Sequence, residues 1–322
     1  MRLLPRVLAI GLLSLVSTSA SVWAADYPTR AIKWVVPYPP AGTTDVLARI
    51  MAQRLSETIG QQVIVENKPG AGGNLATQLV AKAPADGMTL LVTANNHTIN
   101  PTLFADAGYG IHDLVPIADL MWGPSVIVVP ANSPYQSFDQ LLADAKKRPD
   151  AITYGSAGIG TPSHIAGELL NQAAGIKLAH APYRGSGPSL TDLAGGQIPV
   201  VLSSLVAATP LIKSGRIRPL AVTSSKRWPG AEAIPTVAEF GLPKFEHLTF
   251  IGLMAPKGTT QTQANTLSQA VMKVLADPAV TAKVASLGGE VGHMNAQAFK
   301  QFIDADYNLS RQIVQSTGMK PE

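Results

Sequence analysis

The stretch VVPYPPAGTTDVLAR, from Val35 to Arg49, decides the fold because a strand here gives way abruptly to a helix. Its β-branched start is typical of a buried strand, and three prolines and a glycine follow in the turn. Apolar residues then recur at helical spacing, which predicts a helix over residues 46–59. A strand, a tight turn and a helix in this order are the start of a βα unit.

The same alternation of apolar runs and helical patterns continues along the chain. Strands are expected at residues 32–36, 63–65, 88–93, 126–129, 152–154, 179–181, 198–202, 219–223 and 248–254. Helices are expected at residues 46–59, 75–83, 138–147, 163–174, 189–194, 207–214, 262–275, 279–287 and 296–316. This alternation predicts mostly parallel sheets, and 322 residues exceed what one core usually holds. We therefore expect two α/β domains.

The first residues predict an exported protein. Arg2 and Arg6 form a basic region before an apolar run from Val7 to Val16. The small-residue sequence Val22-Trp23-Ala24 then offers a cleavage site. A membrane anchor is the alternative, but the apolar run is short and turns into serine, threonine and alanine. We expect residues 1–24 to be a signal peptide and the mature protein to be soluble in the periplasm.

Composition argues against several classes of function. The net charge is +4, and loss of Arg2 and Arg6 with the leader leaves 23 basic and 21 acidic residues that are not clustered, so no nucleic-acid surface is expected. The absence of cysteine excludes zinc ribbons, thiol nucleophiles and disulfides. The six histidines never occur at metal-ligand spacing, and the GxSxG, P-loop and dinucleotide motifs are absent. We therefore expect no catalytic residues, no metal and no cofactor.

The turn of the opening stretch offers an anion site. Thr43, Thr44 and Asp45 can cap the helix, while the small residues Ala41 and Gly42 would let a ligand approach the backbone. A helix N-terminus has unpaired N–H groups and a partial positive charge, so it can bind an anion without a charged side chain. An ordinary capped helix after a tight turn is the alternative.

A second loop repeats this design about one domain later. The stretch from Thr153 to His164 runs from a strand through a glycine-rich tip to a helix, with Thr161 as the expected N-cap and Pro162 at the first helical position. The N–H groups of residues 157–161 are expected to point outward. His164 is either a ligand-binding residue or a packing and capping residue. Two such helix ends in two lobes predict a cleft that can close on an anion.

With these motifs the chain resembles the periplasmic solute receptors of tripartite tricarboxylate transporters, the Bug type, from about Tyr27 to the C-terminus. The motifs that carry the resemblance are Tyr27-Pro28, Val35–Pro40 with Gly42 and Thr44-Asp45, Val65–Asn74, Ala85–Gly87, Ile99–Pro101, Tyr154–Gly158 with Gly160-Thr161 and Ser163-His164, Pro182–Gly185, Leu220–Ser224 and Ile234–Val237. The resemblance implies a type II periplasmic-binding-protein fold, in which two α/β lobes enclose a ligand cleft. Lobe 1 would hold residues 25–122 and 249–322, and lobe 2 residues 123–248.

The resemblance also implies a function. The protein would capture a small organic carboxylate and deliver it to transporter subunits in the membrane, which lie on other chains, and we expect it to be a monomer. Two alternatives are an exported sensory receptor for the same ligands and an α/β enzyme that uses His97 or His164 as a base. Backbone amides and hydroxyls of the two loops would hold the ligand. Carried over by position, the ligand-binding residues would be Pro39, Ala41, Gly42, Thr43, Thr44, Asn96, His97, Ser156, Ala157, Ile159, Gly160, Thr161, His164, Ser203 and Ser204.

Three positions depart from the family pattern and bear on the ligand. Ala41 replaces a common glycine, Ile159 stands where a polar residue is common, and Ser203 stands where many members have an aspartate. Loss of that carboxylate removes a partner for an ammonium group. The departures disfavour amino-acid ligands and favour an uncharged body, such as an aromatic ring, with one or two carboxylates.

Four charged residues lie close to these motifs. Asp45 is expected to support the first loop, and Arg49, one helical turn further on, is expected outside the pocket. Arg184 is expected in a surface or interlobe ion pair, and Glu168 is expected to be solvated or paired. Helix ends and water can compensate the charge of a carboxylate ligand without these side chains.

Overall fold

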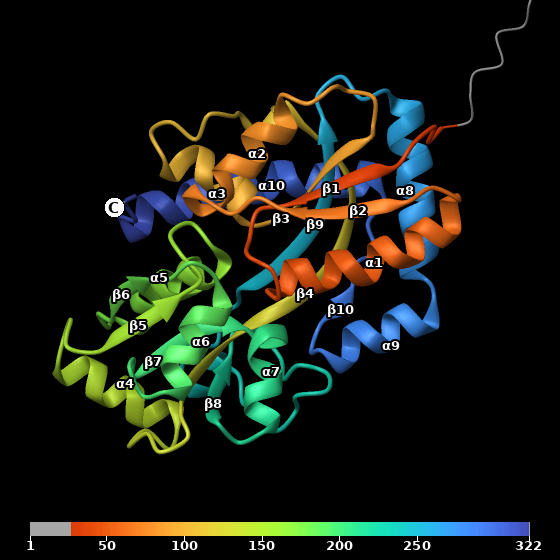
Figure 1. The fold of residues 1–322 in the computed structure, drawn as a ribbon. Helices are drawn as coiled ribbons and strands as arrows, with labels where there is room; N and C mark the ends of the chain where they lie inside the picture. Colours follow the sequence, from red (N-terminus) through yellow and green to blue (C-terminus); the bar gives the residue numbers. More distant parts are fainter. Residues whose placement is uncertain (1–26, 322) are drawn as a thin grey trace, which may run out of the picture.

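The computed structural model describes residues 27–321 and shows two α/β lobes joined by two long strands (Figure 1). The predicted signal peptide, residues 1–24, lies outside the described residues. Lobe 1 is built on a sheet in the order β2-β1-β3-β9-β4, with β10 beside β4. Its strands are β1 (Ile32–Val36), β2 (Val63–Asn67), β3 (Thr89–Ala94), β10 (Glu290–Val291), β9 (Leu248–Pro256) and the first half of β4 (Leu114–Pro130).

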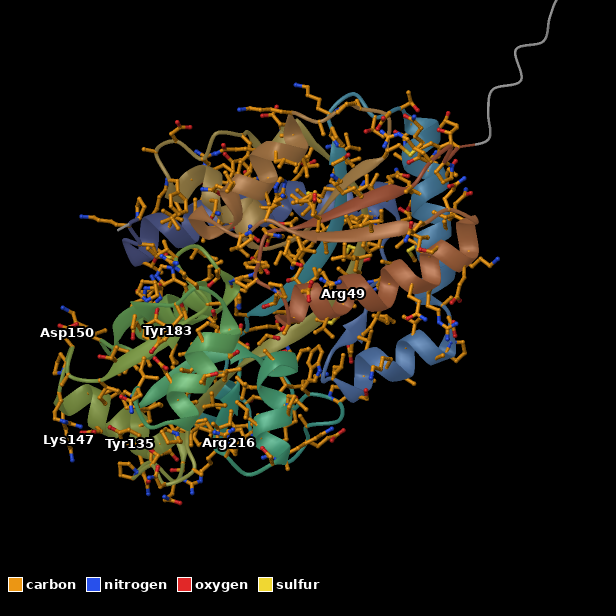
Figure 2. The ribbon with its side chains drawn as sticks, in the orientation of Figure 1. Arg49, Tyr135, Lys147, Asp150, Tyr183 and Arg216 are labelled. Carbon is orange, nitrogen blue, oxygen red and sulfur yellow. The ribbon has the colours of Figure 1, made fainter. Side chains whose placement is uncertain are left out.

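Lobe 2 uses the second half of β4 as the first strand of its own sheet, in the order β4-β7-β5-β6 with β8 on the other side of β4. The other strands are β5 (Thr153–Ser156), β6 (Ala179–Pro182), β7 (Val200–Ser204) and β8 (Ile217–Val222). β5, β6 and β7 are parallel, whereas β4 runs antiparallel to β7 and β8. Figure 2 places Tyr135, Lys147 and Arg216 on the end of this lobe that lies away from lobe 1.

Helices cover both lobes, and no helix among residues 27–321 is long and apolar enough to cross a membrane. The helices are α1 (Thr43–Ile59), α2 (Asn74–Ala81), α3 (Asn96–Leu103), α4 (Phe138–Lys147), α5 (Pro162–Ala174), α6 (Ser186–Ala194), α7 (Leu205–Lys213), α8 (Gln261–Leu275), α9 (Pro278–Ser286) and α10 (Ala296–Thr317). Three short 3₁₀ turns are η1 (Ala71–Gly73), η2 (Ile111–Asp113) and η3 (Val237–Phe240).

The sheet of lobe 1 is buried on both faces, as expected for parallel strands between helices. Trp34 and Leu90 belong to the apolar cluster formed with α1 and α8. Their chain neighbours Val35 and Leu91 belong to the cluster on the opposite face, formed with α2 and α10. Successive side chains of a strand point to opposite faces, so one continuous apolar run serves two cores.

Most elements agree with the sequence prediction, but β4 is longer than predicted. We expect a strand only at residues 126–129, whereas β4 runs for 17 residues from Leu114 to Pro130. Pro116, Gly123 and Pro124 interrupt the apolar pattern, and a proline within a run normally argues against a strand. The strand accommodates Pro116 because the register of its pairing with β9 shifts beside this residue.

A helix that is not among the predicted ones follows β3. Asn96 and His97, which the resemblance implies as ligand-binding residues, open this helix, α3, and are fully buried. Polar residues at its start and Pro101 inside it conceal the helical pattern. The Asn96 side chain accepts a hydrogen bond from the Tyr38 hydroxyl at 2.8 Å and from the Ala94 N–H at 3.2 Å. The Asn96 side chain therefore holds the end of β3 and the loop after β1 together.

β4 and β9 connect the lobes as an antiparallel ribbon. Trp122 pairs with Phe250, Gly123 with Thr249, and Pro124 with Leu248 in the part of the ribbon between the two sheets. We propose lobe boundaries within this ribbon, with residues 25–122 and 249–322 in lobe 1 and residues 123–248 in lobe 2.

The lobes also touch along one side of the cleft, in a region that we call the lateral contact, formed by residues 99–104, 159–165 and 313–319. Buried apolar side chains of α3 and α5 meet there, together with Met319 after α10. Gly160 of lobe 2 packs so closely on Asn100 of lobe 1 that a Cβ atom on Gly160 would overlap Asn100 Oδ1. Asn100 cannot easily turn away, because its Nδ2 donates to Gly72 O at 3.0 Å and to Asn74 Oδ1 at 2.7 Å.

Candidate ligand-binding site

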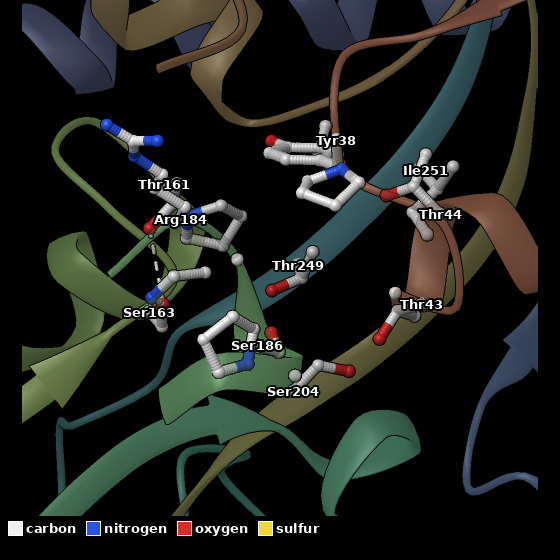
Figure 3. A pocket seen from close by; sticks show the side chains of 18 of the residues that line it. Tyr38, Thr43, Thr44, Thr161, Ser163, Arg184, Ser186, Ser204, Thr249 and Ile251 are labelled. Carbon is white, nitrogen blue, oxygen red and sulfur yellow. Dashed lines mark hydrogen bonds between the residues drawn. The ribbon is translucent and has the colours of Figure 1, made fainter. Parts of the chain in front are cut away.

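A pocket of about 90 Å³ lies between the lobes, and we call it the inner pocket (Figure 3). Four helices begin at its wall: α1 at Thr43, α5 at Pro162, α6 at Ser186 and α7 directly after Ser204. In the described part of the chain, no side chain caps the N-terminus of any of these four helices. Their dipoles bring partial positive charge to the pocket from both lobes, and their first N–H groups are available to a ligand.

Three hydroxyl groups of the inner pocket lack a partner. Thr43 Oγ1, Ser125 Oγ and Thr249 Oγ1 are buried and make no hydrogen bond to any atom of residues 27–321. Ser125 is 1% exposed and Thr249 is 8% exposed. A buried hydroxyl without a partner is unfavourable, and native structures seldom leave one. The hydroxyls belong to residues of α1, β4 and β9, so both lobes and their connection contribute potential donors to the lining of the same pocket.

Asp45 supports the first loop, as the sequence predicts. Its carboxylate accepts hydrogen bonds at 2.9 Å from the Ala41 N–H and from Asn67 Nδ2, and Arg49 forms an ion pair with it at 3.0 Å. Burial raises the pKa of Asp45, but the hydrogen bonds from Arg49, Ala41 and Asn67 outweigh burial and lower it. Ala41 has φ +65°, in the left-handed region that favours glycine, so this network holds the tip of the loop in an unfavourable conformation. Arg49 does not line the described pockets.

The second loop differs from the prediction, because its N–H groups turn inward. Of residues 157–161, four donate N–H hydrogen bonds within the loop and the first turn of α5. The pairs are Ala157 N to Ser163 Oγ at 2.9 Å, Gly158 N to Ser156 Oγ at 3.0 Å, Gly160 N to His164 Nδ1 at 3.2 Å and Thr161 N to Gly158 O at 3.2 Å. The prediction of outward-pointing amides is therefore wrong for these four residues. A glycine-rich tip can fold back onto neighbouring serine and histidine side chains, and this competes with binding.

His164 has a packing role in the structure. It is 5% exposed, accepts the Gly160 N–H and stacks on His180 with ring centroids 4.0 Å apart. Ser156 Oγ lies 2.6 Å from His180 Nε2, so the two rings support the second loop from behind. Burial, followed by the neighbouring His180, lowers the pKa of His164 to about 3. Glu168, expected to be solvated or paired, accepts a hydrogen bond from the Tyr154 hydroxyl at 2.7 Å behind the same loop.

The structure brings only part of the predicted site together. The predicted residues that line the inner pocket are Pro39, Gly42, Thr43, Thr44, Ala157, Thr161 and Ser204. Ile159 lines a second pocket of about 720 Å³, the outer pocket, which also has walls from Pro69–Gly73, Phe104, Tyr183 and Arg184. The remaining predicted site residues line neither of these two pockets in the described structure. They are Ala41, Asn96, His97, Ser156, Gly160, His164 and Ser203.

Several predicted site residues lie outside the pockets for physical reasons. Ser203 and Ser204 are consecutive in β7, so only one of them faces the pocket. Ser203 is fully buried on the other face. His97 lies inside α3, stacks on Tyr109 with centroids 5.7 Å apart and has its pKa lowered by burial to about 4. The enzyme alternative requires His97 or His164 as a base, and neither histidine lines the pocket.

The sequence prediction also misses part of the lining. The missed residues of the inner pocket are Tyr38, Pro40, Ala94, Ser125, Pro162, Ser163, Arg184, Gly185, Ser186, Gly187, Pro188, Thr249 and Ile251. The stretch from Gly185 to Pro188 had a usable signal, since small residues and a proline there open another helix, α6. Ser125 and Thr249 had none, because only pairing with strands far away in the sequence brings them to the pocket. Thr249 pairs with Gly123 of β4, and Ser125 pairs with Ser204 of β7. Arg184 was expected in an ion pair, but it has no such partner within residues 27–321.

The chain is similar in sequence to known proteins over most of its length. Residues 47–319 match the family model described as "Tripartite tricarboxylate transporter family receptor". The chain is 40% identical over 286 residues to the "UPF0065 protein in tcbD-tcbE intergenic region" of Pseudomonas sp. (strain P51), which covers 88% of this chain and 85% of that protein. It is 34% identical over 305 residues to "Protein BugT" of Bordetella pertussis, with 94% of each chain covered.

A solved structure that is described with a ligand superposes closely. The protein Rpa4515 of R. palustris "with adipate" has a TM-score of 0.88 and 35% sequence identity, and the match covers 92% of this chain and 100% of that chain. This likeness extends over both lobes and identifies the architecture as a periplasmic-binding-protein fold.

Proposed function

Since the chain belongs to the family of tripartite tricarboxylate transporter receptors, which are binding proteins and not enzymes, we propose that it captures a small organic carboxylate in the periplasm. The carboxylate would then pass to transporter subunits in the membrane that are separate chains. Residues 1–24 would be the signal peptide that directs export. Rpa4515 is described with adipate, and the similar protein MatC of Rhodopseudomonas palustris is described with bound malate.

One observation favours a carboxylate as the group that the ligand presents to the inner pocket. The unpartnered hydroxyls of Thr43, Ser125 and Thr249 meet the free ends of four helices in one small pocket. Hydroxyls and N–H groups are donors, and a carboxylate offers about four acceptor sites on two oxygens. The inner pocket is therefore suited to a carboxylate group, which needs no cationic side chain there.

The outer pocket supports a ligand body without charge. Phe104, Ile159 and the proline and glycine residues around them give it apolar walls. No acidic side chain of the described residues lines either pocket, so an ammonium group would find no ionic partner. We propose an organic acid with an uncharged body, such as an aromatic ring, and one or two carboxylates.

Thr249→Val tests the inner pocket. A hydrogen bond to a charged group contributes about 1.5–3 kcal/mol, so this nearly isosteric change is expected to weaken carboxylate binding roughly tenfold or more. The stability of the ligand-free protein is expected to stay the same or rise, because valine removes a buried hydroxyl that has no partner in the described structure. Calorimetric titration measures the first effect and thermal unfolding without ligand measures the second.

The titration uses the tightest acid from a thermal-shift screen of the mature chain, in which a ligand at 100 times its Kd adds about 2.7 kcal/mol of stability. Thr266→Val is the matched control, because Thr266 is an exposed residue of α8 outside both pockets. Equal affinities of wild type and Thr249→Val would remove the inner pocket as the carboxylate site.

A further inference from the structure

We propose that Arg184 binds a second anionic group of the ligand, so that the receptor selects elongated dianions over monoanions with the same body. The inference rests on the proposed function, because it assumes that one carboxylate occupies the inner pocket. It assigns to Arg184 the discrimination between ligands of different charge.

Arg184 stands where the two pockets meet. It lines both the inner and the outer pocket, together with Tyr38, Pro39 and Thr161. Figure 3 shows its guanidinium beside Thr161 and across from Tyr38, at a distance from the Thr43, Ser204 and Thr249 hydroxyls. A ligand with one carboxylate among those hydroxyls would extend toward Arg184.

No residue from 27 to 321 compensates the charge of Arg184. It is the one ionic side chain among the described residues that line the two pockets. Its side chain makes no hydrogen bond and no ion pair with the described residues, whereas Arg49 and Arg148 are each paired with an aspartate. Asp192, on the following helix, instead accepts a hydrogen bond from the Tyr183 hydroxyl at 3.0 Å. A planar guanidinium with free donors matches the geometry of a carboxylate.

The backbone of Arg184 is fixed relative to both loops. The Tyr183 N–H donates to Ser156 O at 3.2 Å and the Gly185 N–H donates to Ala157 O at 3.0 Å, which fastens Arg184 to the second loop. Gly185 lies against lobe 1, since a Cβ atom there would be 3.4 Å from Pro39 Cδ. The base of the side chain is thus anchored at the junction of the lobes, while its exposed end remains free to meet a ligand.

The experiment compares diacids with monoacids of the same carbon skeleton. The probes are adipate with hexanoate, suberate with octanoate, and terephthalate with benzoate, each titrated calorimetrically into wild type, Arg184→Gln, Arg184→Lys and Arg216→Gln. Arg216 is the matched control, because it is an exposed arginine of lobe 2 outside both pockets (Figure 2). The substitution Arg216→Gln changes the net charge of the protein by the same amount as Arg184→Gln.

Wild type is expected to bind a diacid more tightly than its matched monoacid. Arg184→Gln is expected to weaken diacid binding about tenfold and to leave monoacid binding unchanged, since only the diacid meets the guanidinium. Arg184→Lys should retain part of the preference, because lysine keeps the charge but not the planar fork. Arg216→Gln should behave as wild type.

Two outcomes would overturn the inference, and they are distinguishable. If the preference for diacid over monoacid is the same in wild type and Arg184→Gln, Arg184 does not bind the second carboxylate. The proposed function as a carboxylate receptor is then unaffected. If no acid of the panel binds wild type, the proposed function itself fails and the role of Arg184 fails with it.

Discussion

Gly160→Ala is expected to weaken carboxylate binding by up to about a hundredfold, although Gly160 is not among the described residues that line the two pockets. A methyl group at this position would overlap Asn100 Oδ1 across the lateral contact. Overpacking of a close contact costs about 1–3 kcal/mol, and here the cost falls only on the arrangement in which the lobes touch. A ligand that needs both lobes would bind with an affinity reduced by the loss of that arrangement.

The reason that Asn100 resists displacement lies in lobe 1. Its amide donates two hydrogen bonds, to Gly72 O and to Asn74 Oδ1, and the side chain is fully buried. Rotation away from a new methyl group would break both bonds. Separation of the lobes breaks neither, so we expect the variant to open along this side of the cleft.

Gly175→Ala separates this effect from backbone strain. Gly175 has φ +60° and Gly160 has φ +71°, so alanine is comparably strained at both positions. Apart from Gly175 itself and its neighbours along the chain, no described atom lies within 4 Å of a Cβ atom on Gly175, and both glycines belong to lobe 2. Calorimetry should show lost affinity in Gly160→Ala alone, and small-angle scattering should show a larger radius of gyration for that variant. Equal loss of affinity in the two variants would attribute the effect to strain rather than to lobe closure.

Acidification from about pH 6.5 to pH 4 is expected to destabilise the folded protein steeply. Burial is the largest cause that lowers the pKa of His97, His180 and His247 to about 4 each, and that of His164 to about 3. An unfolded histidine takes up a proton near pH 6.5, so the unfolded state binds more protons than the folded state throughout this window. Each such histidine steepens the loss of stability by at most about 1.4 kcal/mol per pH unit.

Asp306 acts in the opposite direction. Burial raises its pKa to about 6, against the effect of the hydrogen bond from the Thr98 hydroxyl at 2.5 Å. Between about pH 6 and its ordinary value of 3.8 the folded state holds this proton more tightly than the unfolded state, so acid favours folding through Asp306. One carboxyl offsets one histidine, and the net effect of acid remains destabilising.

Urea unfolding at a series of pH values measures this dependence. His97→Gln should reduce the slope of unfolding free energy against pH by one proton, whatever its effect on stability at pH 7.5. His112→Gln is the control, because it makes the same substitution at a histidine side chain that is 73% exposed. A stability that is constant from pH 6.5 to pH 4.5 would contradict the prediction.

The sequence predicts the fold well because the fold depends on local patterns. The strand, turn and helix around Gly42 form as predicted. Repetition of this unit along the chain produces the alternation of strands and helices in both lobes. Residues of these turns that line the pocket, such as Thr43 and Thr161, are therefore found from sequence.

The remainder of the site depends on contacts between distant segments. Thr249 reaches the pocket through pairing with Gly123, a partner far away in the sequence. The Gly160 N–H turns inward to His164, and the His164 ring stacks on His180 of the neighbouring strand β6. No acidic residue within residues 27–321 forms an ion pair with Arg184, and Asp192 on the next helix accepts a hydrogen bond from Tyr183. Spacing along the chain contains none of this information.

The β4–β9 ribbon has a consequence for how such receptors diversify. Lobe 2 is one uninterrupted segment whose ends are neighbours, since Pro124 pairs with Leu248 and Gly123 with Thr249. Homologous recombination could therefore exchange the whole lobe at two adjacent points without disturbing the core of lobe 1. Such an exchange would carry Ile159 and Arg184 to a new host and leave Thr43 behind. The parts that we propose for telling ligands apart are thus modular, whereas the inner pocket has to be completed anew by the two lobes.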